Sequence, residues 1–166
     1  NFKFNKKTNL VLRLKNSSID SFNPSFRLEQ KISDKISASF SSEFLQSDGV
    51  YRFRYYKKYP DGALAYDTIA KRFDSDIKAK RFETSFHGTM NNGTWNVRGY
   101  GYISNRGIPS AIVNNRFDGR GQRLIDENYF VQANFRKKLF RKFETQFKAK
   151  FAYDYTKYID TVSSIK

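Results

Sequence analysis

The feature that most constrains this chain is a two-residue alternation of apolar and polar side chains between Phe143 and Tyr155. The alternate positions of this stretch are Phe143, Thr145, Phe147, Ala149, Phe151, Tyr153 and Tyr155. Most residues between them are charged or carry an amide. A helix would spread both sets around its circumference, whereas a β-strand places them on opposite faces. The alternation therefore predicts a strand with one aromatic face and one polar face.

The same alternation recurs upstream, and no stretch has the spacing of an amphipathic helix. The apolar positions of the other predicted strands include Leu10, Leu12 and Leu14; Phe26, Leu28 and Ile32; Ile36, Ala38, Phe40 and Phe44; Trp95, Val97 and Ile103; and Tyr129, Val131, Ala133 and Phe135. Mostly polar residues stand between them. The chain is thus predicted to be all-β, with about seven to eight antiparallel strands in up-and-down order.

The predicted connections differ in length between the two ends of the strands. Tight polar turns are predicted at residues 5–8, 33–35, 91–93 and 139–142, and Asn92-Gly93 is a strong two-residue hairpin signal. Longer connections are predicted at residues 16–23, roughly 59–67, and 105–126. Short turns at one end and long loops at the other are typical of outer-membrane barrels.

Charge on the polar faces favours a wide barrel over a small packed one. The chain has 31 Lys and Arg residues against 16 Asp and Glu, a formal net charge of +15. Burying so many unpaired charges in a dry core would be prohibitive, whereas a large barrel has a wet or plugged interior. About seven strands cannot close a barrel of that width. We therefore expect an antiparallel, up-and-down transmembrane β-barrel segment, in which residues 1–166 form one partial barrel domain.

The aromatic positions also fit the thickness of a membrane. A strand tilted by about 40° rises about 2.5 Å per residue along a barrel axis. Tyr153 and Tyr155 then lie roughly 25–30 Å above Phe143. That height matches an apolar band with an aromatic girdle at each edge.

The hairpin predicted between Ile36 and Met90 is long enough to extend past a membrane. Its rising arm contains a predicted bulge at residues 47–49, and its tip is the turn at residues 60–62. Tyrosines gather near this tip, and arginines gather in the loop that follows Ile103.

These two groups supply the candidate ligand-binding residues. They are Tyr55, Tyr56, Tyr59, Tyr66, Arg106, Arg116, Arg120 and Arg123. The rings could stack on a planar ligand, and the arginines could grip an anionic ligand or a surface lipoprotein. The alternatives stay open: girdle or loop packing for the tyrosines, and contact with lipopolysaccharide phosphates or solvent for the arginines.

Residue types that carry catalysis or metal chemistry are scarce. The chain has no cysteine, and its one histidine is His87. No Ser–His–Asp spacing supports a nucleophile, and a lone histidine is a poor metal site, so we expect His87 to face the barrel interior. No run of about 18 apolar residues predicts a membrane-spanning helix. We expect no enzymatic activity, no metal and no cofactor.

Three segments resemble a known family: residues 104–115, which include Arg106-Gly107-Ile108-Pro109, residues 127–135, and residues 148–155. Here the chain resembles barrel strands of TonB-dependent receptors of the Bacteroidetes, and it looks most like their vitamin B12 (corrinoid) branch. The resemblance spans roughly residues 22–160. It implies a barrel of about 22 strands with an N-terminal plug, in the outer membrane of a Gram-negative cell. No plug, TonB box or terminal aromatic strand is recognisable, so we expect an internal fragment.

The expected function is therefore uptake of a scarce nutrient, with a corrinoid favoured over haem or a siderophore. Expected partners are outer-membrane lipid, lipopolysaccharide, the TonB system acting through a plug, a surface lipoprotein and the small-molecule nutrient. One alternative is a soluble basic β-protein that binds nucleic acid, which would mix aromatic and basic residues on one exposed face. Because rings and charges are predicted on opposite faces, we expect no nucleic-acid partner. A passive porin or an adhesin-type barrel is the other alternative.

Overall fold

The structure is a computed structural model that describes residues 7–17, 20–109, 121–140 and 143–160. These residues form nine strands and no helix, so none of them belongs to a helix that could span a membrane. The strands are β1 (Thr8–Ser17), β2 (Ser21–Lys31), β3 (Ile36–Ser47), β4 (Tyr51–Lys58), β5 (Leu64–Arg72), β6 (Ile77–Met90), β7 (Gly93–Gly107), β8 (Arg123–Phe140) and β9 (Phe143–Ile159). The all-β prediction is confirmed.

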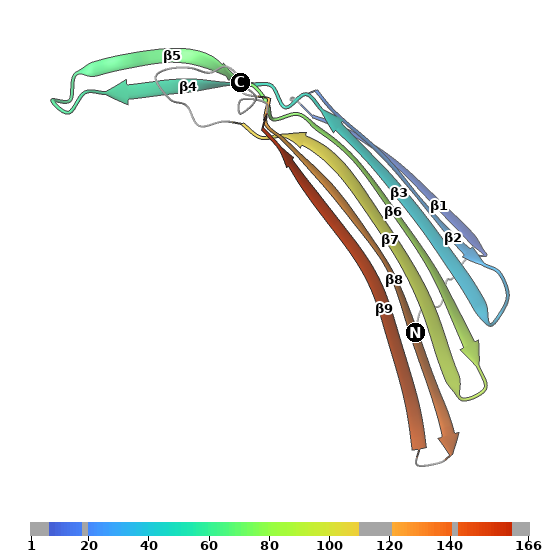
Figure 1. Ribbon diagram of the computed structural model, residues 1–166. Coiled ribbons are helices and arrows are strands. Elements are labelled where there is room, and N and C mark those ends of the chain that lie inside the picture. Colours follow the sequence, from blue (N-terminus) through green and yellow to red (C-terminus); the bar gives the residue numbers. More distant parts are fainter. Residues whose placement is uncertain (1–6, 18–19, 110–120, 141–142, 161–166) are drawn as a thin grey trace.

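Seven of these strands form one antiparallel sheet in the order β1-β2-β3-β6-β7-β8-β9. The strands β4 and β5 pair only with each other, as a hairpin inserted between β3 and β6. Figure 1 shows long, bowed strands side by side, with the β4–β5 hairpin projecting beyond one end of the sheet. The sheet is open within the described residues, with β1 and β9 as its edges, and it is compatible with a section of a barrel wall.

The register gives this sheet two unlike faces. Trp95 of β7 is paired with Phe135 of β8, which is paired with Phe147 of β9, and similar rows repeat along the strands. We call this side the ring face. Its large apolar members include Leu10, Leu12, Leu14, Phe26, Leu28, Phe40, Phe44, Phe82, Phe86, Trp95, Val97, Ile103, Tyr129, Val131, Phe135, Phe147, Phe151, Tyr153 and Tyr155. The opposite side, rich in Ser, Asn, Gln and charged residues, is called the polar face.

The ring face is open in the structure. Leu12, Phe147 and Phe151 are 72%, 62% and 73% exposed, and Phe40 is 40% exposed. Among the described residues, the buried hydrophobic side chains are only Ala70 and Ala79. A globular protein of this size would bury large rings in a core, so the exposed rings form an apolar surface rather than an interior.

Glycines let some rings lie across the neighbouring strand of the ring face. A Cβ atom on Gly88 would lie 2.2 Å from the Trp95 ring, and one on Gly101 would lie 2.1 Å from the Phe82 ring. Each glycine is the direct ladder partner of the residue whose ring covers it. The ring therefore fills the space that a side chain would otherwise take.

Strands run further into the predicted loops than the sequence indicates. The strands β1 and β2 stay paired as far as Ser17 and Ser21, so the long connection predicted at residues 16–23 is wrong. The strand β7 continues to Gly107 and β8 begins at Arg123, which shortens the predicted loop at residues 105–126. Continued strand pairing provides hydrogen bonds for backbone groups that would otherwise bond to water, and polar side chains on these strands do not prevent it.

The sorting of connections by length remains only in part, because the β1–β2 connection is short although it lies at the same end as the long connections. The β2–β3, β6–β7 and β8–β9 connections are short and lie at one end of the strands, which we call the short-turn end. The opposite end of the strands, which we call the long-loop end, has the β4–β5 insertion and the connection from residue 108 to 122. The turn predicted at residues 33–35 is confirmed, whereas the first half of the turn predicted at residues 5–8 lies outside the described residues.

The β6–β7 turn is displaced by one residue from its predicted position. Met90 is paired with Gly93, so the central residues of the turn are Asn91 and Asn92. Asn92 adopts a left-handed φ of 62°, which asparagine tolerates better than most residues. Gly93 is needed for a different reason, because a Cβ there would lie 2.6 Å from the Arg136 carbonyl oxygen.

The predicted bulge at residues 47–49 is also wrong, because β3 ends at Ser47 and the chain crosses into β4. Gly49 has a left-handed φ of 61°, and a Cβ there would lie 2.0 Å from the Ser75 carbonyl oxygen. Two segments that flank the hairpin therefore cross in close contact at its base. The predicted tip is confirmed: Gly62 has a φ of 85°, and its amide donates to the Tyr59 carbonyl at 3.0 Å.

Candidate functional site

Ion pairs run across the polar face of the sheet. The pairs on this face are Arg27–Glu29 at 2.6 Å, Arg98–Glu83 at 3.0 Å, Arg106–Asp126 at 3.3 Å, Arg81–Glu43 and Arg136–Glu144. Their arginine side chains are all about half exposed. Exposed pairs contribute only about 0–1 kcal/mol each, so these contacts orient the side chains more than they stabilise the sheet.

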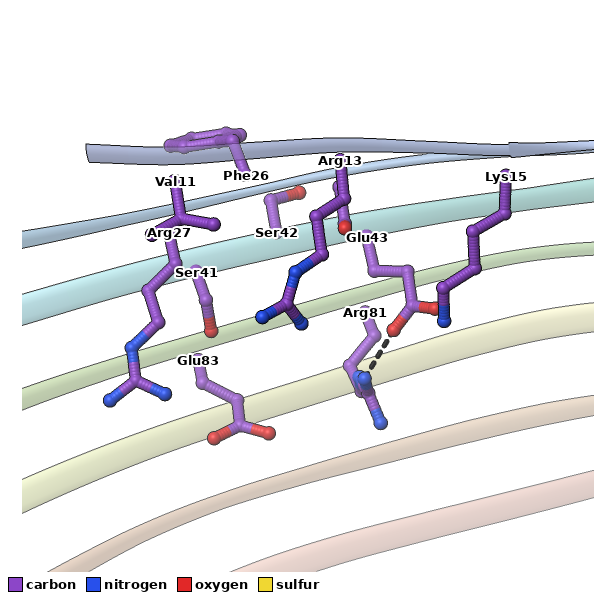
Figure 2. Close-up of a pocket in the computed structure, with 11 residues that line it drawn as sticks. Val11, Arg13, Lys15, Phe26, Arg27, Ser41, Ser42, Glu43, Arg81 and Glu83 are labelled. Carbon is purple, nitrogen blue, oxygen red and sulfur yellow. Dashed lines mark hydrogen bonds and ion pairs between the residues drawn. The ribbon is translucent and has the colours of Figure 1, made fainter.

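Four strands line one hollow of about 290 Å³ on the polar face (Figure 2). Its charged residues are Arg13, Lys15, Arg27, Glu43, Arg81 and Glu83, so cations outnumber carboxylates. Figure 2 shows them on the side of the sheet opposite the Phe26 ring. The strands β1 and β6 stand about 14 Å apart, across three strand spacings. Side chains from both strands line the same hollow, which indicates that this face of the sheet is concave.

A second hollow of about 360 Å³ is lined by serines together with charged, amide and apolar side chains. The Ser39 and Ser85 hydroxyl oxygens lie 2.8 Å apart there. His87 lines this hollow together with Asn96. The histidine thus lies on the polar side of the sheet, as the sequence predicts.

A stacked aromatic pair interrupts the polar face. Tyr100 of β7 and Phe130 of β8 are direct cross-strand partners, with ring centroids 5.1 Å apart and planes inclined by 16°. The Lys150 ammonium lies 5.0 Å from the Phe130 centroid, and the Arg98 guanidinium carbon lies 5.9 Å from it. We call these four residues the ledge. The sequence analysis missed them, although the run Tyr129-Phe130-Val131 breaks the alternation and could have indicated them.

The four predicted tyrosines belong to the β4–β5 hairpin but do not share one surface. Tyr55 and Tyr66 lie together, with ring centroids 5.5 Å apart in an edge-on arrangement. Tyr56 lies on the other face of the hairpin, where Lys58 and Arg54 approach its ring. Tyr59 stands at the tip and is 58% exposed. The four predicted tyrosines therefore do not form one stacking platform.

An ion pair braces this hairpin between its strands. The guanidinium of Arg54 donates to both carboxylate oxygens of Asp67, at 2.8 Å and 2.6 Å. These hydrogen bonds hold the pKa of Asp67 below its ordinary value.

Of the predicted arginines, two are described and both are engaged. Arg106 lies 3.3 Å from the Asp126 carboxylate. Arg123 donates to both Asp76 carboxylate oxygens, at 2.7 Å and 3.3 Å, and to the Asn105 side-chain oxygen at 2.7 Å. Such a doubly bonded guanidinium anchors structure more readily than it captures a ligand. The other two, Arg116 and Arg120, lie outside the described residues.

Arg123 belongs to a set of contacts that anchors both ends of the connection between β7 and β8. The Gly107 amide donates to the Asp76 carbonyl at 2.8 Å, and the Gly121 amide donates to the Asp74 carboxylate at 2.9 Å. A Cβ on Gly107 would lie 2.5 Å from the Asp76 carboxylate. We call these contacts the loop clamp. They tie the connection to the segment that enters β6.

Within the described ranges, no group of three or more His, Asp or Glu side chains is placed to hold a metal ion. No protein-family model matches the chain, and a search of curated proteins finds no match either. The function must therefore be inferred from the two faces of the sheet, the ledge and the long-loop end.

Proposed function

We propose that this chain is part of the wall of an outer-membrane β-barrel that takes up a scarce nutrient in a Gram-negative cell. The observation that carries the proposal is the uncovered ring face, where rings such as Phe147 and Phe151 are mostly exposed. Apolar surface costs about 25 cal/mol per Å² in water, and contact with lipid chains removes that cost. A sheet with lipid on one side and water on the other needs opposite faces of this kind.

The heights of the aromatic rows support the membrane assignment. The row Trp95–Phe135–Phe147 lies toward the short-turn end, and the pair Tyr129–Tyr153 lies toward the long-loop end. Six residues separate the two rows along β9, which is about 15 Å along the axis of a tilted strand. Both rows then fit within an apolar band about 25 Å tall and its flanking girdles.

The polar face supports a wet barrel interior. Its ion pairs are half exposed and its hollows are lined by serine, asparagine and charged groups. Such groups are stable beside water and costly inside a dry core. A barrel with a water-filled or plugged lumen provides that environment.

The finer assignment rests on the resemblance described above. We propose a TonB-dependent receptor, with a corrinoid favoured over haem or a siderophore as the nutrient. The ligand would be captured at the long-loop end, next to lipopolysaccharide and a surface lipoprotein. TonB, acting through a plug domain, would supply the energy for transport.

Single-cysteine labelling tests which face meets lipid, because the chain itself has no cysteine. Val131 and Gln132 are neighbours on opposite faces of β8. In isolated outer membranes, Gln132→Cys should react with a charged maleimide, whereas Val131→Cys should react at least about tenfold more slowly, because a thiol in hydrocarbon rarely ionises. Both should react after denaturation. Equal reaction rates in the membrane would refute the membrane assignment.

Uptake measurements test the receptor assignment separately. Cells that carry the full protein should bind labelled cyanocobalamin, and loss of TonB should abolish its uptake while surface binding remains. Uptake that continues without TonB would indicate a passive porin instead. Binding of haem or a ferric siderophore in place of cyanocobalamin would overturn the choice of nutrient.

A further inference from the structure

The ledge is a place where the polar face departs from its own pattern with accessible aromatic rings. Tyr100 and Phe130 stack on each other between strands, on a surface otherwise rich in ions, hydroxyls and amides. Both rings are only partly buried. An aromatic pair that stays accessible on a wet surface offers a stacking partner to another flat ring.

The surroundings of Phe130 leave room beside its ring. Its ladder partner on β9 is Ala152, whose methyl group is too short to cover an aromatic face. The group from β9 that does approach the ring is the Lys150 ammonium, at 5.0 Å from the centroid. Lys150 is exposed, so a ligand can displace it without unpacking the sheet.

The two cations at the ledge differ in their engagement. Arg98 donates to the Glu83 carboxylate at 3.0 Å, which offsets its charge. Lys150 has no ion pair among the residues that the structure describes. An ammonium that rests on a ring, without a carboxylate, is available to an incoming anion.

Amide side chains border the ledge on the same face. Gln132 lies two residues from Phe130 along β8, toward the short-turn end, and Asn128 lies two residues from it toward the long-loop end. Asn128 already donates to the Asp154 carboxylate at 2.8 Å, which fixes its position. Carboxamides both donate and accept hydrogen bonds, so they suit the edge of a heterocycle or the hydroxyls of a sugar.

We propose that the ledge binds a flat heterocycle joined through a sugar to a phosphate, a nucleotide-like small molecule. The heterocycle stacks on Phe130 and extends the pair that Phe130 makes with Tyr100. The Lys150 ammonium leaves the Phe130 ring and meets the phosphate. This goes beyond the proposed uptake function, because it concerns the polar face alone and does not depend on what the ring face contacts.

Three probes distinguish the contribution of the stacked heterocycle from that of the phosphate. Adenosine 5′-monophosphate carries both the ring and the anion, adenosine lacks the phosphate, and ribose 5-phosphate lacks the ring. Calorimetric titration of the full chain in detergent micelles should show the monophosphate binding at least about tenfold more tightly than either of the other two. Stacking and a charge-assisted contact each contribute a factor of about this size.

Two variants should divide these effects between the ring and the ammonium. Phe130→Leu should weaken binding of the monophosphate and of adenosine about tenfold, with ribose 5-phosphate unchanged. Lys150→Met should weaken binding of the monophosphate and of ribose 5-phosphate, with adenosine unchanged. Lys148→Met is the matched control, because Lys148 is the next lysine on the same face of β9 and lies opposite Asn134 instead. It should change every affinity by less than about twofold.

A measurement on the unaltered chain removes any dependence on how the variants fold. In the spectrum of chain labelled with ¹³C at phenylalanine, the monophosphate should shift the Phe130 ring signals and leave those of Phe147, on the ring face, in place. Absence of binding, or equal losses in Lys148→Met and Lys150→Met, would overturn the proposal. Tight, salt-sensitive binding of a single-stranded oligonucleotide in preference to the monophosphate would replace it with a nucleic-acid interface.

Discussion

Replacing Ala133 with arginine tests the environment of the ring face where that environment should matter most. Ala133 is paired with Ala149 of β9, which is six residues from both Phe143 and Tyr155. At about 2.5 Å of axial rise per residue, it lies about 15 Å from each edge of the aromatic band. Because alanine has little packing to lose, the cost of Ala133→Arg comes from the guanidinium rather than from a cavity.

The expected magnitude follows from this depth. An arginine on the lipid face of a barrel costs about 2–4 kcal/mol at the bilayer midplane and about 0–1 kcal/mol near its edges. Ala133→Arg should therefore lower the folding equilibrium constant in lipid about 30- to 1000-fold. Thr145→Arg, on the same face near the short-turn end, should cost about 1 kcal/mol or less. Asn134→Arg, on the polar face beside Ala133, should be close to neutral.

The assay is urea unfolding of the full protein in phosphatidylcholine vesicles, followed by loss of β-structure in circular dichroism. The variants are compared by their urea midpoints, provided that the slope of the unfolding free energy against urea concentration is the same. A changed slope would mean that the unfolded state itself had changed. Equal destabilisation by Ala133→Arg and Asn134→Arg would refute the assignment of the two faces. Equal destabilisation by Ala133→Arg and Thr145→Arg would refute the depth calculation while leaving the faces in place.

Three further predictions concern the long-loop end. Gly49→Ala should cost about 1–3 kcal/mol and speed proteolysis at the base of the hairpin, because its φ of 61° and the carbonyl oxygen across the crossing leave no room for a Cβ. Arg123→Met should speed hydrogen exchange of the Gly107 amide about fivefold, since the loop clamp loses roughly 1 kcal/mol of partly screened contacts. The Arg54–Asp67 pair lowers the carboxyl pKa, so its stabilisation is complete above about pH 4 and is lost as the pH falls through the lowered folded pKa. Tyrosine fluorescence of the hairpin should report that loss, and Arg54→Met should abolish this contribution.

The separation of the two faces could be predicted because the alternation survives every hairpin of the sheet. Trp95, Phe135 and Phe147 come from three different strands, yet the register places them in one row. Since the side-chain period of a strand is two, a register shift of one residue would have moved one of them to the polar face. Each strand carries its own pattern, so the local sequence was sufficient to predict the two faces.

The details of the long-loop end could not be predicted in this way. Arg123 and Asp76 are 47 residues apart in sequence, and nothing near either residue indicates their pairing. Likewise, no local feature shows that β3 stops at Ser47 and that the next two strands leave the main sheet. For Arg106 and Arg123, the sequence predicts contact with a ligand, a lipoprotein, lipopolysaccharide or solvent, because it does not reveal the carboxylates that the fold brings to them from elsewhere.

Breaks in the alternation on the polar face fall into two physically different kinds. Leu45 and Ala79 are direct partners near the long-loop end, where Ala79 is 6% exposed and its other partner, Ser104, is 1% exposed. Ala79 is therefore covered, and packing explains it.

Phe130 breaks the same pattern but stays partly accessible, and among the described residues the lysine against its ring has no ion pair. The described contacts of its ring are the Tyr100 stack and the Lys150 and Arg98 cations, and the exposed Lys150 can leave without unpacking the sheet. Where local pattern and environment disagree without a stabilising reason, function is the better explanation. The distinction can be measured on stability alone. Ala79→Leu should destabilise the sheet because it overfills a covered site, whereas Phe130→Leu should lower the unfolding midpoint far less and alter mainly what the polar face binds.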